Sequence, residues 1–183
     1  MRRARRFFDP NFRPKERRQA NVLACVLFWS VLSYLAISRA VISGAQVDGD
    51  SMVPTLFNGD RVILNRLRYR VTQPARGEVI ALDVPGYAGM SVKRIIGLPG
   101  ETVQIRNQMV YINGKPLDEP YLAPGILTWP VTLSTNVYEI APNCYFVLGD
   151  NRYESLDSRR FGAVERTWIR GRVAGNEYAE YKY

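Results

Sequence analysis

The chain contains the segment Thr102-Val-Gln-Ile-Arg-Asn-Gln-Met-Val-Tyr-Ile112, in which apolar and polar side chains alternate on either side of Asn107-Gln108. Alternation with a period of two is typical of a strand with one buried and one exposed face. Two such runs joined by two residues predict a β-hairpin, with Thr102–Arg106 and Met109–Ile112 as its strands. This local pattern indicates a β fold.

Short runs of the same kind extend in both directions from the hairpin, separated by Gly, Pro, Asn and Asp as at turns. The other predicted strands are Arg61–Asn65, Glu78–Asp83, Ser91–Ile96, Asn136–Ile140, Tyr145–Leu148 and Trp168–Ala174. No helical apolar period longer than two turns follows residue 45. We therefore expect a mainly β domain, either a coiled antiparallel sheet or a partly open barrel. Residues 114–135 hold four prolines and no clean alternation, which predicts a small loop-rich insertion.

Composition restricts the chemistry available to this chain. Its 183 residues include no histidine, which excludes a Ser-His-Asp triad, a Cys-His dyad and a histidine zinc site. Cys25 and Cys144 are 119 positions apart, so neither a CxxC redox motif nor a cysteine-rich metal cluster is available. We expect no metal and no cofactor, and acid–base chemistry falls to Lys, Asp, Glu or Tyr.

The net charge of +8 is concentrated at the N-terminus. Residues 1–19 hold eight basic residues against Asp9 and Glu16, whereas the other 164 residues carry 17 basic and 15 acidic side chains. A basic tail on a nearly neutral body differs from the basic face of a nucleic-acid-binding domain. We therefore expect no nucleic acid partner.

An apolar run follows the tail. From Ala20 to Ser38 there are 19 residues without a charge, and 15 of them are apolar. A helix of roughly 20 residues crosses the ~30 Å hydrocarbon core of a bilayer, so the run predicts a transmembrane helix over residues 20–42, surrounded by membrane lipid. Under the positive-inside rule, residues 1–19 stay cytoplasmic and residues 43–183 form a domain on the outer face of the plasma membrane.

Two other interpretations of the N-terminal region compete with this anchor. A cleavable secretory signal has the same order of charges, but its apolar part usually has only about 7–15 residues. Ser38-Arg39-Ala40 is also a poor cleavage site. A buried helix behind a nucleic-acid-binding tail is the second alternative. The length of the run favours the anchor.

Ser51 and Lys93 are the candidate catalytic pair. Ser51 begins the segment Ser51-Met-Val-Pro-Thr-Leu56 just beyond the apolar run, and a serine nucleophile without histidine needs another base. A lysine kept neutral by burial can serve as that base. Of the lysines outside the tail, Lys115 lies in a turn and Lys182 is next to last, whereas Lys93 lies within an apolar strand.

Four segments in order resemble the signature boxes of type I signal peptidases, the Ser-Lys family of the bacterial leader peptidase. They are Ser51–Leu56, Gly77–Asp83, Val92–Glu101 and Gly149–Gly162, and the resemblance covers roughly residues 20–175. It implies a membrane-anchored serine endopeptidase that removes N-terminal signal peptides from translocated preproteins. Cleavage would follow small residues, with Ala-x-Ala preferred. Ser51 would be the nucleophile and Lys93 the general base.

The resemblance also implies supporting roles for residues near this dyad. Ser155 matches the family serine that hydrogen-bonds the lysine amine and orients it. Asp157 and Arg159 match a structural ion pair near the dyad, and Arg94 would be a second cation.

Further residues match scaffold, oxyanion or pocket positions. Asp150 and Arg152 match residues of a turn that supports the site. Gly49 stands where the Gram-negative branch has a serine that stabilises the oxyanion, as in relatives with a single anchor, so the backbone N–H of Ser51 would carry more of that role. The residues expected to line the pocket for small substrate side chains are Val47, Met52, Leu56 and Val92.

Three other functions remain open. A self-cleaving Ser-Lys protease of the DNA-damage response shares a similar catalytic β fold, but the apolar run and the lack of a helix-turn-helix pattern disfavour it. A second possibility is a specialised relative that matures pilins or conjugation proteins. The sequence distinguishes such a relative poorly from a general signal peptidase. A catalytically inactive, membrane-anchored β module that binds partners would be expected to lack Ser51, Lys93 or Ser155, and all three are present.

Overall fold

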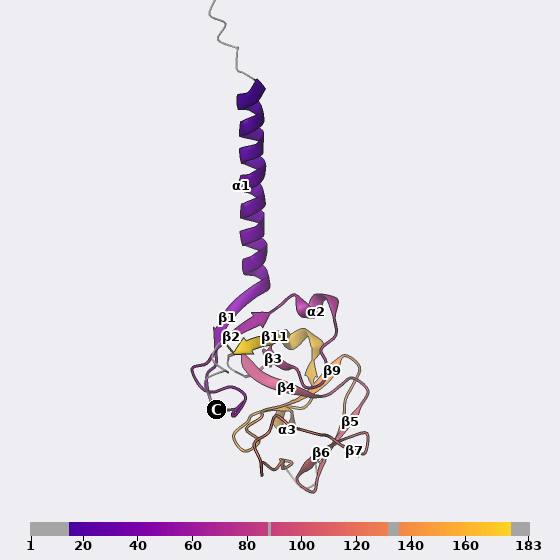
Figure 1. Cartoon of the computed structure of the whole chain (residues 1–183). Helices are drawn as coiled ribbons and strands as arrows, with labels where there is room; N and C mark the ends of the chain where they lie inside the picture. Colours follow the sequence, from indigo (N-terminus) through magenta and orange to yellow (C-terminus); the bar gives the residue numbers. More distant parts are fainter. Residues whose placement is uncertain (1–14, 88, 132–135, 177–183) are drawn as a thin grey trace, which may run out of the picture. The chain divides into compact units, whose positions relative to one another are not determined.

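The computed structural model describes residues 15–87, 89–131 and 136–176 (Figure 1). The chain divides into two compact units, residues 1–40 and residues 41–183. Most of the predicted basic tail, up to position 14, lies outside the described residues.

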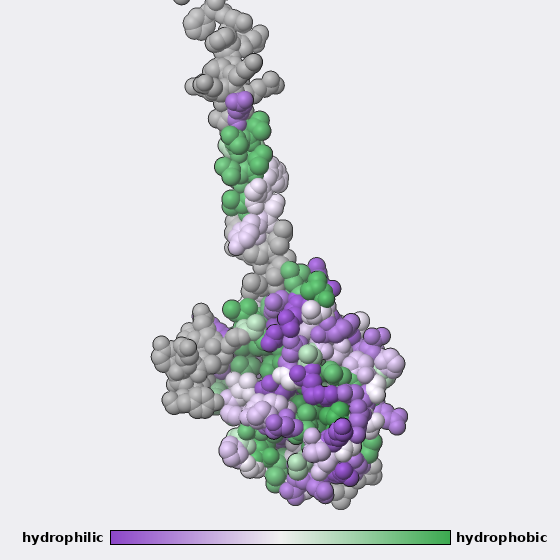
Figure 2. Space-filling model, turned by 45° about the vertical axis from the view of Figure 1, so that its right-hand side comes forward, coloured by the Kyte–Doolittle hydropathy of each residue, from purple (hydrophilic) through white to green (hydrophobic). Residues whose placement is uncertain are grey.

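The N-terminal unit contains α1 (Lys15–Val41), a helix of 27 residues that includes the apolar run. Its described side chains from Asn21 to Tyr34 are exposed, and Figure 2 shows hydrophobic residues gathered along part of this helix. Within the ranges described, the structure contains no helix whose length and hydropathy together suit a membrane crossing.

The C-terminal unit is built from two antiparallel sheets (Figure 1). Among the described residues the larger sheet has seven strands in the order β1-β2-β11-β3-β4-β9-β10. These strands are β1 (Ile42–Gln46), β2 (Arg61–Asn65), β3 (Val79–Leu82), β4 (Ser91–Gly97), β9 (Cys144–Leu148), β10 (Val164–Glu165) and β11 (Ile169–Asn176). The prediction of a mainly β, antiparallel domain is confirmed.

The smaller sheet has the order β7-β6-β5-β8. Its strands are β5 (Thr102–Arg106), β6 (Met109–Ile112), β7 (Lys115–Pro116) and β8 (Val137–Glu139). The predicted hairpin is present, because Arg106 pairs with Met109 across the turn. Asn107 and Gln108 have φ values of +48° and +62°, as a tight two-residue hairpin turn requires.

In the described part of the β domain, three short helical segments connect the strands: α2 (Arg68–Val71), α3 (Ser158–Phe161) and a 3₁₀ turn at Arg166–Trp168. The insertion predicted at residues 114–135 contains β7 at its start, and residues 117–131 have neither helix nor strand. Loop structure in that region agrees with its proline content. The remaining residues of the predicted insertion, 132–135, lie outside the described part of the chain.

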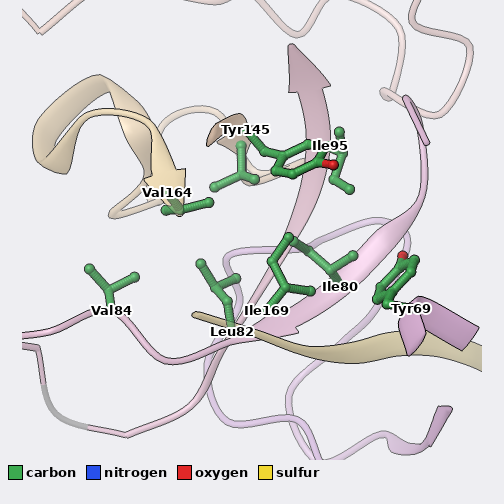
Figure 3. Packing of buried hydrophobic residues seen from close by; sticks show 9 residues of the cluster. Tyr69, Ile80, Leu82, Val84, Ile95, Tyr145, Val164 and Ile169 are labelled. Atoms are coloured by element: carbon green, nitrogen blue, oxygen red, sulfur yellow. The ribbon is translucent and has the colours of Figure 1, made fainter. Parts of the chain in front are cut away.

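Strand β4 separates two hydrophobic clusters. Ile95 packs in a cluster with side chains of β3, β9 and β11; Figure 3 shows Ile80, Leu82 and Ile169 facing Ile95 and Tyr145 across it. Ile96 packs on the other side with residues of β5 and β6. Because neighbouring residues of a strand point to opposite faces, burial on both sides leaves no solvent-facing row, and β4 is buried from Lys93 to Gly97. Two charged residues, Lys93 and Arg94, are thus held in the interior.

Candidate active site

The nucleophile candidate, Ser51, lies in a tight turn between β1 and β2. The Val53 N–H donates to the Asp50 carbonyl at 3.2 Å, and the Leu56 N–H donates to the Met52 carbonyl at 3.0 Å. Met52 and Leu56 are buried in the same hydrophobic cluster as strand residues of β2 and β3. Ser51 itself stays partly exposed, while its buried neighbours fix the turn.

Lys93 reaches this hydroxyl from β4. Its Nζ lies 2.9 Å from Ser51 Oγ and donates a second hydrogen bond to the Val92 carbonyl at 3.0 Å. The residue is only 4% exposed, and this burial lowers the pKa of Lys93 below its ordinary value, although the carboxylates of Asp157 and Asp150 oppose the shift. A lysine that deprotonates more readily, in contact with a serine hydroxyl, has the geometry of a nucleophile and its general base.

Arg94, the next residue in β4, forms a buried ion pair with Asp150. Its Nε donates to Asp150 Oδ1 at 2.9 Å and its Nη2 to Oδ2 at 2.6 Å. Thr55 joins the pair through its hydroxyl, which donates to Asp150 Oδ2 at 2.5 Å. Asp150 therefore connects β4, which carries Lys93, to the turn that carries Ser51. The sequence had predicted only a supporting turn position for it.

The predicted ion pair of Asp157 and Arg159 is formed, with both contacts at 2.8 Å. Asp157 is fully buried and also accepts a hydrogen bond from the Gly149 N–H at 3.1 Å. This ion pair therefore fixes the segment that follows β9, beside the dyad. The predicted second cation, Arg94, binds Asp150 and not Asp157.

Ser155 and the Ser51 carbonyl oxygen lie against the same face of Gly149. A Cβ built on Gly149 would be 2.2 Å from Ser155 Oγ and 2.5 Å from the Ser51 carbonyl oxygen, so glycine is the residue that this close approach permits. Among the described residues Ser155 Oγ is buried without a hydrogen-bond partner. The expected hydrogen bond from Ser155 to the Lys93 amine is thus not formed here, because that amine bonds Ser51 and Val92.

Asn151 connects the same segment directly to the nucleophile turn. Its N–H donates to the Ser51 carbonyl at 3.1 Å, and its side-chain amide donates to the Asp50 carbonyl at 3.1 Å. Asn151 was not among the site residues predicted from the sequence. Only its place within the Gly149–Gly162 segment could have indicated a role.

The insertion contributes two residues, Glu119 and Tyr121, that were not predicted for the site. Arg152, predicted as scaffold, donates from Nε to the Gly149 carbonyl at 3.0 Å and forms an ion pair with Glu119 at 2.5 Å. The Tyr121 hydroxyl donates to Glu119 at 2.7 Å, and its ring lies 3.9 Å from the Arg94 guanidinium carbon. Glu119 and Tyr121 therefore bind both arginines that hold the catalytic segment.

Gly49 differs from its predicted role in one respect. The expectation was that glycine allows close approach near the oxyanion, but a Cβ built on Gly49 meets no atom of the described structure within 4 Å. Its φ of +89° is the feature that favours glycine. Its N–H donates to the Asn58 side chain at 3.2 Å, which helps to fix the turn.

The residues predicted to line the substrate pocket form a core beside the nucleophile. Val47, Met52 and Leu56 are 1–5% exposed and pack together in one cluster, with Val92 partly buried against it. The buried side chains therefore hold the Ser51 turn in place, and Val92 is the most exposed residue of the four.

Comparisons with known proteins agree with this geometry. A family model described as signal peptidase, peptidase S26, matches residues 19–176. The chain belongs to the signal peptidase family. Its membership confirms the prediction of a serine peptidase of the signal peptidase I type, and it favours that function over a self-cleaving regulatory protease.

Individual signal peptidases show the extent of the similarity. The chain is 42% identical over 155 residues to signal peptidase I of Bacillus caldolyticus, covering 80% of this chain and 85% of that protein. It is 41% identical over 136 residues to signal peptidase I S of Bacillus subtilis strain 168, covering 71% and 73%. A crystal structure of a signal peptidase I from Enterococcus faecalis V583 aligns with a TM-score of 0.50 at 37% identity, covering 57% of this chain and 99% of that one.

Proposed function

We propose that Ser51 is the nucleophile and Lys93 the general base of a peptidase that removes N-terminal signal peptides from preproteins. The observation that carries this proposal is the 2.9 Å contact between Ser51 Oγ and the buried Nζ of Lys93. When the amine is neutral, it accepts the serine proton as Oγ attacks the scissile carbonyl. The protonated amine then donates that proton to the leaving nitrogen, and water hydrolyses the acyl-enzyme by the same relay.

The backbone around Ser51 supports stabilisation of the oxyanion. A backbone N–H at the nucleophile itself is a common donor to the tetrahedral intermediate. The turn is fixed on one side by Asn151, which holds the Ser51 carbonyl, and on the other by the buried Met52 side chain. We propose that the Ser51 N–H acts as this donor, with Gly49 supplying the backbone conformation that places it.

Ser155 is proposed to orient the lysine amine during the reaction. Its hydroxyl is buried, lacks a partner among the described residues, and lies against the same glycine as Ser51. A buried hydroxyl without a partner costs free energy, and a hydrogen bond to the Lys93 amine would recover that cost when the amine comes within reach. Asp157 and Arg159 act through structure, because the ion-paired Asp157 accepts the Gly149 N–H and fixes the glycine against which Ser51 and Ser155 both lie.

The substrate end of the proposal concerns the residues before the cleavage site. We propose that small residues, with Ala-x-Ala preferred, bind beside Ser51 against Val92 and the Met52 cluster. Close packing of that cluster leaves little room for a large side chain, which supports selection of small ones.

The location of the peptidase is also a proposal. The uncharged run from Ala20 to Ser38 lies within α1, its described apolar side chains are exposed, and the basic residues precede it. We propose that this helix anchors the chain in the plasma membrane with the N-terminus in the cytoplasm and the β domain on the outer face. Protease added to intact spheroplasts is then expected to digest the β domain. Survival of that domain until the cells are lysed would contradict this topology.

The activity is tested with the purified full chain in detergent. A preprotein whose signal ends in Ala-x-Ala is expected to be cut once, and sequencing of the new N-terminus locates the cut. Ser51→Ala is expected to abolish cleavage while the far-UV spectrum stays unchanged, and Ser33→Ala on α1 serves as the matched control. Cleavage by purified Ser51→Ala at the wild-type rate would rule out the proposed nucleophile.

A further inference from the structure

A pocket of about 240 Å³ lies beside the proposed dyad but is not formed by it. One wall is the insertion segment 129–131, and the other consists of residues between Arg152 and Arg160, Ser155 among them. The two walls are connected, because Arg159 Nη1 donates to the Trp129 carbonyl at 3.3 Å and Arg152 Nη1 donates to the Thr128 hydroxyl. The pocket is thus a built feature of the β domain.

The charges that line this pocket are not balanced. Arg152 is paired with Glu119, and Arg159 is paired with Asp157. Arg160 is exposed and has no carboxylate partner among the described residues. Two of the three arginines are therefore neutralised, and the third leaves one positive charge available to a ligand.

The pocket also exposes aromatic surface. Trp129 is 46% exposed and Tyr153 is 59% exposed, and both line it. Aromatic side chains beside a charged group are typical of sites that bind an extended peptide or a small organic ligand. The ligand that fits is a peptide segment that presents an acidic side chain to Arg160 and apolar atoms to the two rings.

The position of Ser155 connects this pocket to the nucleophile. Ser155 lines the pocket, and its hydroxyl and the Ser51 carbonyl oxygen lie against the same face of Gly149. An extended chain advances by about 3.3 Å per residue, so a peptide bound across Ser51 would reach the pocket within its next few residues.

The remaining question is which end of the substrate arrives there. The proposed pocket for small residues before the scissile bond lies on the side of Ser51 formed by Met52 and Val92. The pocket with Trp129 includes Ser155 and shares no lining residue with that apolar group. Because the residues before the bond occupy the apolar group, the segment after the bond is the end of the substrate left to reach Arg160.

We propose that this pocket binds the first residues of the mature protein, immediately after the cleavage site, and that Arg160 makes it prefer an acidic side chain there. Arg160 is then a specificity-determining residue of the peptidase. The proposal rests on the proposed function, because it requires cleavage at Ser51.

The test uses peptides that span one signal cleavage site and differ only at a single position. Asp, Asn or Lys is placed in turn at each of the first four positions after the bond, and kcat/KM is measured with the detergent-solubilised full chain. At one or more of these positions we expect the Asp peptide to be cleaved about three times faster than the Lys peptide, the size expected for one exposed charge pair. The difference should shrink as salt is added.

Exchange of the charge on the enzyme provides the decisive comparison. In Arg160→Glu the ratio of Asp to Lys peptides is expected to invert, and in Arg160→Ala it is expected to fall to about one. Arg70→Glu is the matched control, because Arg70 is an exposed arginine on α2 and its exchange changes the net charge equally. The ratio of kcat/KM for the Asp and Lys peptides is measured within one enzyme, so differences in folded fraction between variants do not affect it.

The outcomes separate this proposal from the proposed function. If the wild-type enzyme cleaves all the peptides at the same rate, or discriminates between charges only at positions before the bond, the pocket does not recognise the mature segment. Equal inversion by Arg70→Glu would likewise overturn it, since the effect would then come from net charge. If wild type cleaves none of the peptides, the proposed function itself fails, and this inference fails with it.

Discussion

Arg94 binds Asp150 through two hydrogen bonds, 2.9 Å from Nε to Oδ1 and 2.6 Å from Nη2 to Oδ2. Both side chains are buried, and Lys93 is the residue next to Arg94. The pair therefore sets the charge around the proposed base, because an uncompensated Asp150 carboxylate would hold the Lys93 ammonium charged.

Removal of that carboxylate is expected to affect stability and pH dependence separately. Asp150→Asn leaves Arg94 buried without its counter-ion, which should cost about 3–5 kcal/mol in the free energy of unfolding. The same change removes a charge that raises the pKa of Lys93, so kcat/KM of the folded fraction should reach half its plateau at a lower pH. Urea titration and a pH profile measure the two effects.

The exposed ion pair of Arg170 and Asp83 is the matched control, with side chains 52% and 44% exposed. Asp83→Asn should change the free energy of unfolding by less than about 1 kcal/mol and leave the pH profile in place. Equal losses in the free energy of unfolding for the two variants would mean that burial does not make the Asp150 pair more important for stability.

Lys93 should give the peptidase an alkaline pH profile with a single ionisation below the value of free lysine. Burial lowers the pKa of Lys93, and only the neutral amine accepts the Ser51 proton, so kcat/KM rises with pH through this lowered pKa and then levels off. Lys93→Arg should lose at least about 1,000-fold in kcat/KM, because a guanidinium stays protonated. Turnover near wild type in purified Lys93→Arg would assign the base to another residue.

Gly149 should tolerate no side chain. In Gly149→Ala the new Cβ would lie 2.2 Å from Ser155 Oγ and 2.5 Å from the Ser51 carbonyl oxygen, so one of these groups must move. We expect a loss of about 1–3 kcal/mol in stability and of about 100-fold in kcat, since a small displacement of a reacting group has that effect. Thermal unfolding and single-turnover cleavage measure both. In Gly44→Ala the added Cβ meets no described atom within 4 Å, so this variant should behave as wild type.

Tyr121 should affect catalysis although it lies in the insertion. Tyr121→Leu removes the ring that stacks on Arg94 and the hydroxyl that binds Glu119, and we expect kcat to fall about tenfold with a smaller change in KM. Tyr121→Phe keeps the ring and should recover most of kcat. Tyr111→Leu is the control, because Tyr111 stacks on Arg106 at 4.3 Å in the hairpin of β5 and β6. A larger loss of kcat in Tyr111→Leu would show that the insertion has no particular influence on the dyad.

The alternation of apolar and polar residues predicted most of the strands, because that pattern is contained within each short run of residues. Alternation and turn residues placed β5 and β6 at their observed bounds, and Arg61–Asn65 coincides with β2. β1 escaped prediction because Ile42–Gln46 contains Ser, Gly and Ala where an apolar strand residue would be expected. Ile42–Gln46 forms a strand through its pairing with β2, and this pairing cannot be recognised from the local sequence alone. The arrangement of the strands in two sheets likewise depends on contacts between distant runs.

Prediction of the site had the same limit. The motif residues Ser51 and Lys93 were found, and the structure brings them into contact. Glu119 and Tyr121 were missed because a single acidic or aromatic residue in a loop carries no signal of its own. Their roles depend on Arg152 and Arg94, which lie far away in the sequence and meet them only in the folded domain. The positive φ at Gly49 was likewise invisible, since glycine is compatible with several backbone conformations.

The hydrogen bonds from Asn151 to the carbonyls of Asp50 and Ser51 have a consequence during synthesis of the protein. The nucleophile is made early, but the groups that hold its turn, including Asn151 and the Asp157 pair, are encoded about 100 residues later. Because domains fold only when their contacting segments are available, a partly translated chain lacks this geometry. Because residues 151–159 lie in the last fifth of the 183-residue sequence, the nucleophile turn is not fixed until almost the whole chain has left the ribosome.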